Sequence, residues 1–210
     1  MKRLAIALLA SFAVSASVAH GQPLVVNEID YDQVGTDTAE FVEIKNNGMA
    51  VNLNGIVVEF VNGSGGAVYK TVALPAVVLA GGDYFVICAN TGTVSNCDLD
   101  ETPDTDLIQN GTPDAVRIVN TVTMLTLDAL SYEGSTAGAT EGTGASATDS
   151  NTVPFIGVSR FPDGADTNDN NTDASLRCIT PGTANTSAAM GCQAVATEPT
   201  VWGSFKTLYR

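Results

Sequence analysis

Short runs of β-branched and aromatic residues, each ended by glycine, asparagine or aspartate, constrain the fold of this chain most strongly. Helical periodicity is nearly absent beyond the N-terminal segment. Asn-Gly dipeptides at 47–48, 54–55, 62–63 and 110–111 supply the left-handed turn positions that are typical of β-hairpins. Many short strands at this spacing predict an all-β domain, built as a sandwich of two sheets.

The hydrophobic pattern of these runs indicates which strands are buried. We expect strands at Leu24–Asp30, Glu40–Asn46, Gly55–Val61, Val68–Leu74, Tyr84–Ala89, Leu107–Gln109, Ala115–Val119, Leu125–Tyr132 and Gly157–Phe161. In the second strand, Val42 and Ile44 share one face and the charged residues at 43 and 45 share the other, which indicates a half-exposed strand. The run Tyr84–Ala89 is apolar on both faces, which predicts a central strand.

The N-terminus has the organisation of a secretory signal peptide. Lys2 and Arg3 precede an apolar run, Leu4–Val14, that is too short to cross a bilayer as a helix. Ser17-Val18-Ala19 fits the small-x-small rule, so we expect a signal peptide of residues 1–19, with cleavage after Gly21 as the second choice. An uncleaved anchor is the alternative. No later stretch is apolar for long enough to span a membrane, so the mature chain is expected to be secreted, outside the cell or at its surface.

Charge and histidine content exclude several classes of function. Removing residues 1–19 takes away two of the nine basic residues and none of the 23 acidic ones, so the net charge changes from −14 to −16. This charge repels phosphate backbones and argues against a nucleic acid partner, whereas it favours divalent cations. His20 is the only histidine and lies at the expected cleavage point. The sequence therefore offers no buried Ser-His-Asp or Cys-His site and no histidine-ligated zinc centre.

The four cysteines lie in two local pairs, Cys88 with Cys97 and Cys178 with Cys192. An even number in an exported chain indicates disulfides, and pairing between neighbours is the simplest of three connectivities. A zinc site made of four thiolates is the alternative, but the sequence has no CxxC spacing.

An acidic loop near the C-terminus is the strongest candidate for a metal site. Its possible oxygen ligands are Asp163, Asp166, Asn168, Asp169 and Asp173. Calcium takes six to eight oxygen ligands, which such a loop supplies, although the spacing is not that of an EF-hand. The alternative is a loop whose side chains cap its own backbone.

A second acidic group lies near the N-terminal end of the mature chain. Its members are Glu28, Asp30, Asp32, Asp37, Glu40 and Glu43. A glycosidase needs two carboxylates, but the only tryptophan lies in the C-terminal tail, and alternation places Glu40 and Glu43 on opposite faces. We therefore expect a solvated strand edge whose charges discourage pairing between edges, and no carboxylate with a tuned pKa.

Two stretches are poor in large apolar side chains. Glu133–Thr152 is expected to form a mobile loop, since it cannot bury enough surface to offset its ordering entropy. Thr186–Thr200 is expected to be a linker, apart from Cys192. These boundaries place one domain at residues 24–192 and a linker with a tail at residues 193–210.

The last nine residues form a distinct tail. Trp202, Phe205, Leu208 and Tyr209 recur at steps of three and four and would form one apolar face in a helix. The pattern WGxxKxLYR is similar to short C-terminal tags on exported bacterial proteins, which implies sorting or anchoring. The alternative is a short helix docked on its own domain.

Several short elements occur in an order typical of one known family. They are NEID (27–30), DTAEFVEIKN (37–46), LNG (53–55), GGDYFVIC (81–88), SYEG (131–134), PDGADTNDNNTD (162–173) and TPGTAN (180–185). In order and spacing, the region from about Leu24 to Asn185 resembles the lamin tail domain of bacterial secreted proteins. The resemblance implies an immunoglobulin-like β-sandwich that binds or anchors and that has no active site. The chain departs from the family at Ile56, where a tryptophan is usual shortly after the LNG turn.

These observations favour a non-enzymatic extracellular module that mediates adhesion or surface association. We expect no cofactor apart from a possible structural calcium, and a partner that is a protein or another cell-surface component. A small secreted hydrolase that uses acidic residues is one alternative. A structural subunit of a surface assembly is another.

Overall fold

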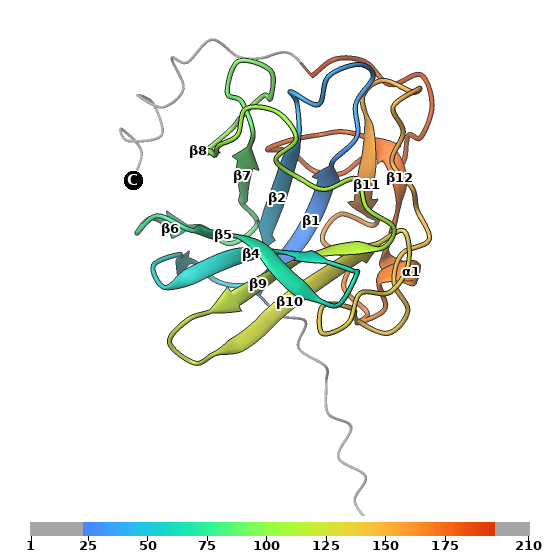
Figure 1. Ribbon diagram of the computed structural model, residues 1–210. Helices are drawn as coiled ribbons and strands as arrows, with labels where there is room; N and C mark the ends of the chain where they lie inside the picture. Colours follow the sequence, from blue (N-terminus) through green and yellow to red (C-terminus); the bar gives the residue numbers. More distant parts are fainter. Residues whose placement is uncertain (1–22, 196–210) are drawn as a thin grey trace, which may run out of the picture.

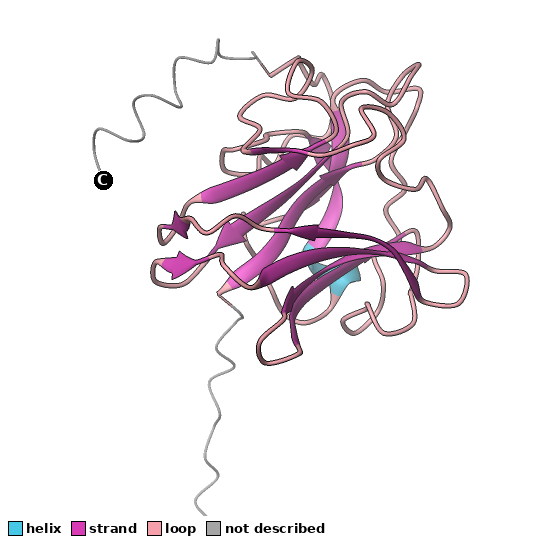
Figure 2. Ribbon diagram, turned by 60° about the vertical axis from the view of Figure 1, so that its left-hand side comes forward, coloured by secondary structure: helices cyan, strands magenta, loops and turns pink. Residues whose placement is uncertain are grey.

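The computed structural model describes residues 23–195, and its regular secondary structure is almost entirely β-strand, arranged mainly in two stacked sheets (Figures 1 and 2). The larger sheet contains β1 (Leu24–Asp30), β2 (Phe41–Asn46), β7 (Tyr84–Cys88), β8 (Leu99–Asp100), β11 (Ile156–Arg160) and β12 (Ala174–Cys178). Its order is β12-β11-β1-β2-β7-β8, and all neighbours are antiparallel except β7 and β8.

The smaller sheet packs across the larger one. It contains β4 (Ile56–Asn62), β5 (Ala67–Ala73), β9 (Asp114–Asn120) and β10 (Leu125–Tyr132) in the antiparallel order β10-β9-β4-β5. A two-stranded ribbon joins β3 (Val51–Asn52) to β6 (Val78–Leu79), and α1 (Asn170–Asp173) is a single helical turn. The two sheets form a β-sandwich, as the sequence predicts.

The core lies between the sheets and follows the alternation of the strands. On β4, Val58 and Phe60 are fully buried, as are Ile29 of β1 and Ile44 of β2 on the facing sheet. Burial of such side chains contributes about 1.5–3 kcal/mol each before the entropy of ordering is counted.

Most of the predicted strands are present, and the main differences are at Leu107–Gln109 and at β12. Leu107–Gln109 is not a strand: Leu107 and Ile108 are buried, and their N–H groups donate to the side chain of Glu40 instead of to a neighbouring strand. Strand β12 is not among the predicted strands: ASLRC alternates apolar and polar residues but contains no β-branched or aromatic residue.

The expectation of a half-exposed second strand is wrong. β2 lies in the middle of the larger sheet, between β1 and β7, and the Glu43 side chain on its outer face is fully buried. The loops 161–169 and 179–185 cover that face, because Asp163 and Gly182 both contact side chains of β2. Strand β7 has neighbours on both sides, which agrees with its apolar character.

The loop Glu133–Thr152 is not the plain solvated excursion that its lack of large apolar side chains suggests. Thr136, Ala139 and Ala145 of this loop are buried. Backbone hydrogen bonds fix it, including Gly134 N to Ala145 O and Ala145 N to Ser131 O. Small side chains let the backbone approach the sheet closely, so hydrogen bonds replace the missing apolar burial.

The structure contains disulfides between Cys88 and Cys97 and between Cys178 and Cys192, which indicates an oxidising environment. The predicted linker contacts the domain as far as it is described, because Ser95 Oγ donates to the carbonyl of Val195. Within residues 23–195, no helix is long and apolar enough to cross a membrane. The expected signal peptide and the C-terminal tail lie outside the described residues.

Candidate functional site

The most unusual feature of the interior is a buried arginine. Arg160, at the end of β11, is fully buried. Its Nε donates to Val26 O at 2.9 Å, and Nη1 donates to Ala165 O and to Asp173 Oδ2, both at 3.0 Å. Its Nη2 contacts both carboxylate oxygens of Asp128 of β10, at 2.9 and 3.2 Å. All three nitrogens of the guanidinium group therefore donate, Nε and Nη2 to one group each and Nη1 to two.

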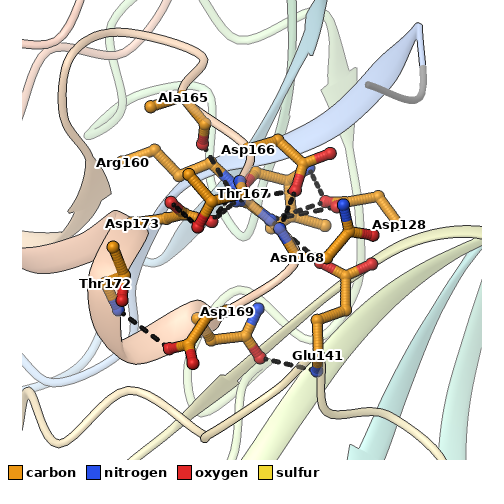
Figure 3. A network of polar contacts seen from close by, with 12 residues as sticks. Asp128, Glu141, Arg160, Ala165, Asp166, Thr167, Asn168, Asp169, Thr172 and Asp173 are labelled. Atoms are coloured by element: carbon orange, nitrogen blue, oxygen red, sulfur yellow. Dashed lines mark hydrogen bonds and ion pairs between the residues drawn. The ribbon is translucent and has the colours of Figure 1, made fainter. Parts of the chain in front are cut away.

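Four carboxylates surround this single positive charge (Figure 3). Asp128 and Asp173 form hydrogen-bonded ion pairs with it. Glu141 Oε2 lies 3.7 Å from Nη2 and Asp166 Oδ1 lies 3.6 Å from Nη1, so these two carboxylates are close without being hydrogen-bonded. Each carboxylate comes from a different segment: β10, loop 133–155, loop 161–169 and α1.

Two carboxylate oxygens of this group are buried and accept no hydrogen bond, Glu141 Oε2 and Asp166 Oδ2. One oxygen from each of Asp128, Glu141 and Asp166 lies within 4.8 Å of the others. Oxygen atoms at this spacing could hold a hard cation.

A glycine permits the approach of the two loops that carry Glu141 and Asp166. Gly142 has a φ of +56°, and a Cβ at this position would lie 2.9 Å from the carbonyl oxygen of Asn168. The neighbouring backbone is joined by hydrogen bonds from Asn170 N to Glu141 O and from Asn171 N to Thr143 O.

Burial strongly affects the protonation of these acids. It raises the pKa of the Asp128 carboxyl well above its ordinary value, although the adjacent Arg160 guanidinium opposes the shift. Burial and, next, the charge of Asp166 raise the pKa of Glu141, again against the effect of Arg160. Both shifts favour the protonated carboxyl, which means that Arg160 offsets only part of the cost of burying these groups in the ionised form.

Only part of the predicted acidic calcium loop takes part in this group. Asp166 and Asp173 face Arg160, whereas Asn168 is exposed and has a φ of +57°. Asp169 is the N-cap of α1, where its side chain accepts from Thr172 N.

Asp163 lies at a separate place. Its carboxylate forms an ion pair with Lys45 and accepts hydrogen bonds from Tyr84 Oη and Asn27 Nδ2. Burial alone would raise the pKa of Asp163, but these hydrogen bonds outweigh it and the pKa is lowered. The five predicted ligands therefore do not converge on one centre.

The acids of β1 and β2 are buried, so the predicted solvated strand edge is wrong. Glu28 accepts hydrogen bonds from Ser159 Oγ and Thr180 N, and Glu43 accepts from Asn27 Nδ2 and Gly182 N. These acids attach the TPGTAN segment to the centre of the sheet. The NEID and FVEIKN segments near the start of the domain therefore lie beside the TPGTAN segment near its end.

Burial raises the pKa of three acids toward neutrality, which contradicts the expectation that no carboxylate has a tuned pKa. The values are about 7 for Glu28, about 8 for Glu40 and about 7 for Asp149. Backbone N–H groups oppose the shift in each case, from Thr180 for Glu28 and from Leu107 for Glu40. Each acid accepts hydrogen bonds from the backbone of a loop and so holds that loop in place, although burial disfavours the ionised form of the acid.

An open groove of about 270 Å³ lies at one end of the sandwich. The loops after β1 and β7 meet there (Figure 1). Its walls include the apolar side chains of Val34, Val94, Phe155 and Ile179, and Val34 and Phe155 are exposed.

Asp30 lies at the wall of this groove and is nearly fully buried. Burial and then the charge of Asp149 raise its pKa well above the ordinary value. Asp32 and Asp37, which belong to the same acidic group in the sequence, lie on the loop between β1 and β2.

The sequence analysis missed Asp128, Glu141 and Arg160. One signal was available: Asp128 is a charged residue at an inward position of the apolar run Leu125–Tyr132. A search with protein-family models gives no match to this chain, and neither does a search of curated proteins.

Proposed function

We propose that the protein is a non-enzymatic interaction module of the lamin-tail type, exported and associated with the cell surface. The order of the NEID, FVEIKN, PDG and TPGTAN elements supports this proposal, as does their placement on one two-sheet sandwich with two disulfides. An immunoglobulin-like topology is part of the same proposal.

The observation that carries the proposal is the groove at the loop end of the sandwich. Val34 and Phe155 are exposed there by 54% and 40% of their surface, beside Val94 and Ile179. Exposed apolar side chains that gather around a concavity are typical of binding surfaces. The partner is a protein segment with apolar side chains and positive charge, because the chain has a net charge of −14.

Surface association of purified protein tests this proposal. Val34→Asp and Phe155→Asp place charges in the groove and are expected to raise the dissociation constant for cells by about tenfold or more, which corresponds to a loss of about 1.4 kcal/mol of binding free energy. Val122→Asp is the matched control, because Val122 is 82% exposed in the β9–β10 turn at the far end of the sandwich (Figure 1). Undiminished binding by both groove variants contradicts the proposal.

Deletion of residues 201–210 separates the groove from the tail. If the tail is the sorting or anchoring element, its deletion shifts the protein from the cells to the medium while the groove variants stay attached.

A second candidate, an acid-dependent hydrolase, is favoured by one observation, the Asp30–Asp149 carboxyl pair beside the groove. Two carboxyl groups that share a proton can act as acid and base. Asp30→Asn discriminates the two: the interaction module retains surface association, whereas a hydrolase loses turnover of its substrate.

A further inference from the structure

The carboxylates around Arg160 outnumber the positive charges that hold them. The guanidinium nitrogens donate to Asp128, Asp173 and two backbone carbonyl groups. Glu141 and Asp166 lie in the same region, yet their nearest oxygens are 3.7 and 3.6 Å from Arg160, beyond hydrogen-bond distance. Burying carboxylates without a compensating partner is strongly unfavourable, so this arrangement points to a second cation.

Unpartnered atoms give an independent indication. Asp166 Oδ2 is buried and accepts no hydrogen bond, and the Asp166 side chain is only 3% exposed. Glu141 Oε2 is likewise buried without a hydrogen bond. Among the described residues, buried oxygen atoms without a partner occur only on these two side chains, and both carboxylates belong to the same group of three with Asp128.

We propose that Asp128, Glu141 and Asp166 bind a calcium ion beside Arg160. Calcium binds carboxylate oxygens at about 2.3–2.6 Å, so two oxygens on one ion are at most about 5.2 Å apart. The three oxygens satisfy that limit as they stand. Magnesium binds oxygens at about 2.1 Å in near-ideal octahedral geometry, so it tolerates less variation in ligand spacing than calcium. Backbone carbonyl groups and water complete the shell.

The three ligands join segments that are far apart in the sequence. Asp128 belongs to β10, Glu141 to loop 133–155, and Asp166 to the loop before α1. Bound calcium therefore fastens loop 133–155, which has no large apolar side chain between residues 134 and 152, to the rest of the domain. The site stands independently of the proposed groove, which lies at the loop end of the sandwich.

Calcium titration of the EDTA-treated protein tests the site, with calorimetry and the melting temperature as readouts. We expect binding with a dissociation constant of about 10⁻⁴–10⁻³ M, as in other extracellular modules, and a rise in melting temperature that saturates with calcium. Asp166→Asn and Glu141→Gln keep the size of the side chains and are expected to weaken binding by about tenfold or more, because ligand charge sets the affinity.

Asp169→Asn is the matched control on the same loop. It removes one charge but leaves an equally good N-cap for α1. If calcium were held by the acidic loop itself, Asp169→Asn would weaken binding and Glu141→Gln would not.

Amide chemical shifts of the wild-type protein decide the case if a variant does not fold. Calcium is expected to shift the amide signals around Asp128, Glu141 and Asp166 together. Absence of binding at millimolar calcium overturns the proposal, as do shifts confined to Asp163 and Asp169 or equal affinity of all three variants.

Discussion

Glu40 gives the sharpest test of the electrostatics in this interior. Its side chain is fully buried and accepts hydrogen bonds from Leu107 N and Ile108 N. Burial raises its pKa from 4.5 to about 8, against the opposing effect of those two N–H groups. The folded protein therefore binds a proton at Glu40 that the unfolded chain has released, throughout the range between these two values.

The sign of the pH dependence follows from this difference. Because the pKa is raised in the folded state, the contribution of Glu40 is complete below about pH 4.5 and is lost as the pH rises toward 8. Within that window, one extra bound proton corresponds to about 1.4 kcal/mol per pH unit, so Glu40 alone removes about 3 kcal/mol between pH 5 and pH 7. Glu28 and Asp149, with pKa values of about 7, act in the same direction.

Urea denaturation of the wild type and Glu40→Gln across this range measures the effect. The variant cannot titrate, so its free energy of unfolding is expected to fall less steeply with pH, by about 1.4 kcal/mol per unit. Asp104→Asn changes the net charge equally at an exposed position and is the matched control. A constant difference between wild type and Glu40→Gln from pH 5 to pH 7 would refute the reasoning, since Glu40 would then be ionised in the folded protein.

Three further perturbations test the structure. Arg160→Met leaves buried carboxylates without their hydrogen-bonded cation and is expected to lower the free energy of unfolding, measured by urea denaturation, by about 3–5 kcal/mol. A decrease below about 1 kcal/mol would show that these ion pairs contribute little to stability. Replacing either disulfide by two alanines is expected to lower the free energy of unfolding by about 3 kcal/mol, because the unfolded chain without the cross-link gains entropy. The loss should be at least as large for Cys178–Cys192, 14 residues apart, as for Cys88–Cys97, 9 residues apart. A lower melting temperature for the variant without Cys88–Cys97 would contradict this order. In Gly142→Ala the new Cβ would lie 2.9 Å from Asn168 O, so the free energy of unfolding is expected to fall by about 1–3 kcal/mol. Gly191→Ala has a similar φ but open space around it and should lose less stability. Equal melting temperatures of the two variants would show that the close approach at Gly142 does not limit stability.

Much of the sandwich was predictable because strands leave local signals. Runs of β-branched and apolar residues located β1, β4, β9 and β10 to within a residue or two, whereas among the four Asn-Gly glycines only Gly55 has the predicted left-handed φ. The segment at 107–109 was mistaken for a strand, because apolar residues with buried N–H groups look the same whether a strand or the side chain of Glu40 accepts the hydrogen bonds.

The candidate sites were less predictable. The acidic loop pointed to a cation region, but only Asp166 among its five candidates belongs to the group with unpartnered oxygens. Asp128 and Glu141 come from segments that are remote in sequence, so spacing along the chain carries no information about their meeting.

Local sequence is enough to predict the all-β character and the approximate positions of most strands, since these depend on β-branched and aromatic content and on a period of two residues. Contacts between distant segments enclose the acids of the central strands, pack a loop of small residues and bring four carboxylates to one arginine. The physical reason is that burial depends on what covers a strand from elsewhere in the chain, and a carboxylate is exposed or enclosed according to that cover alone.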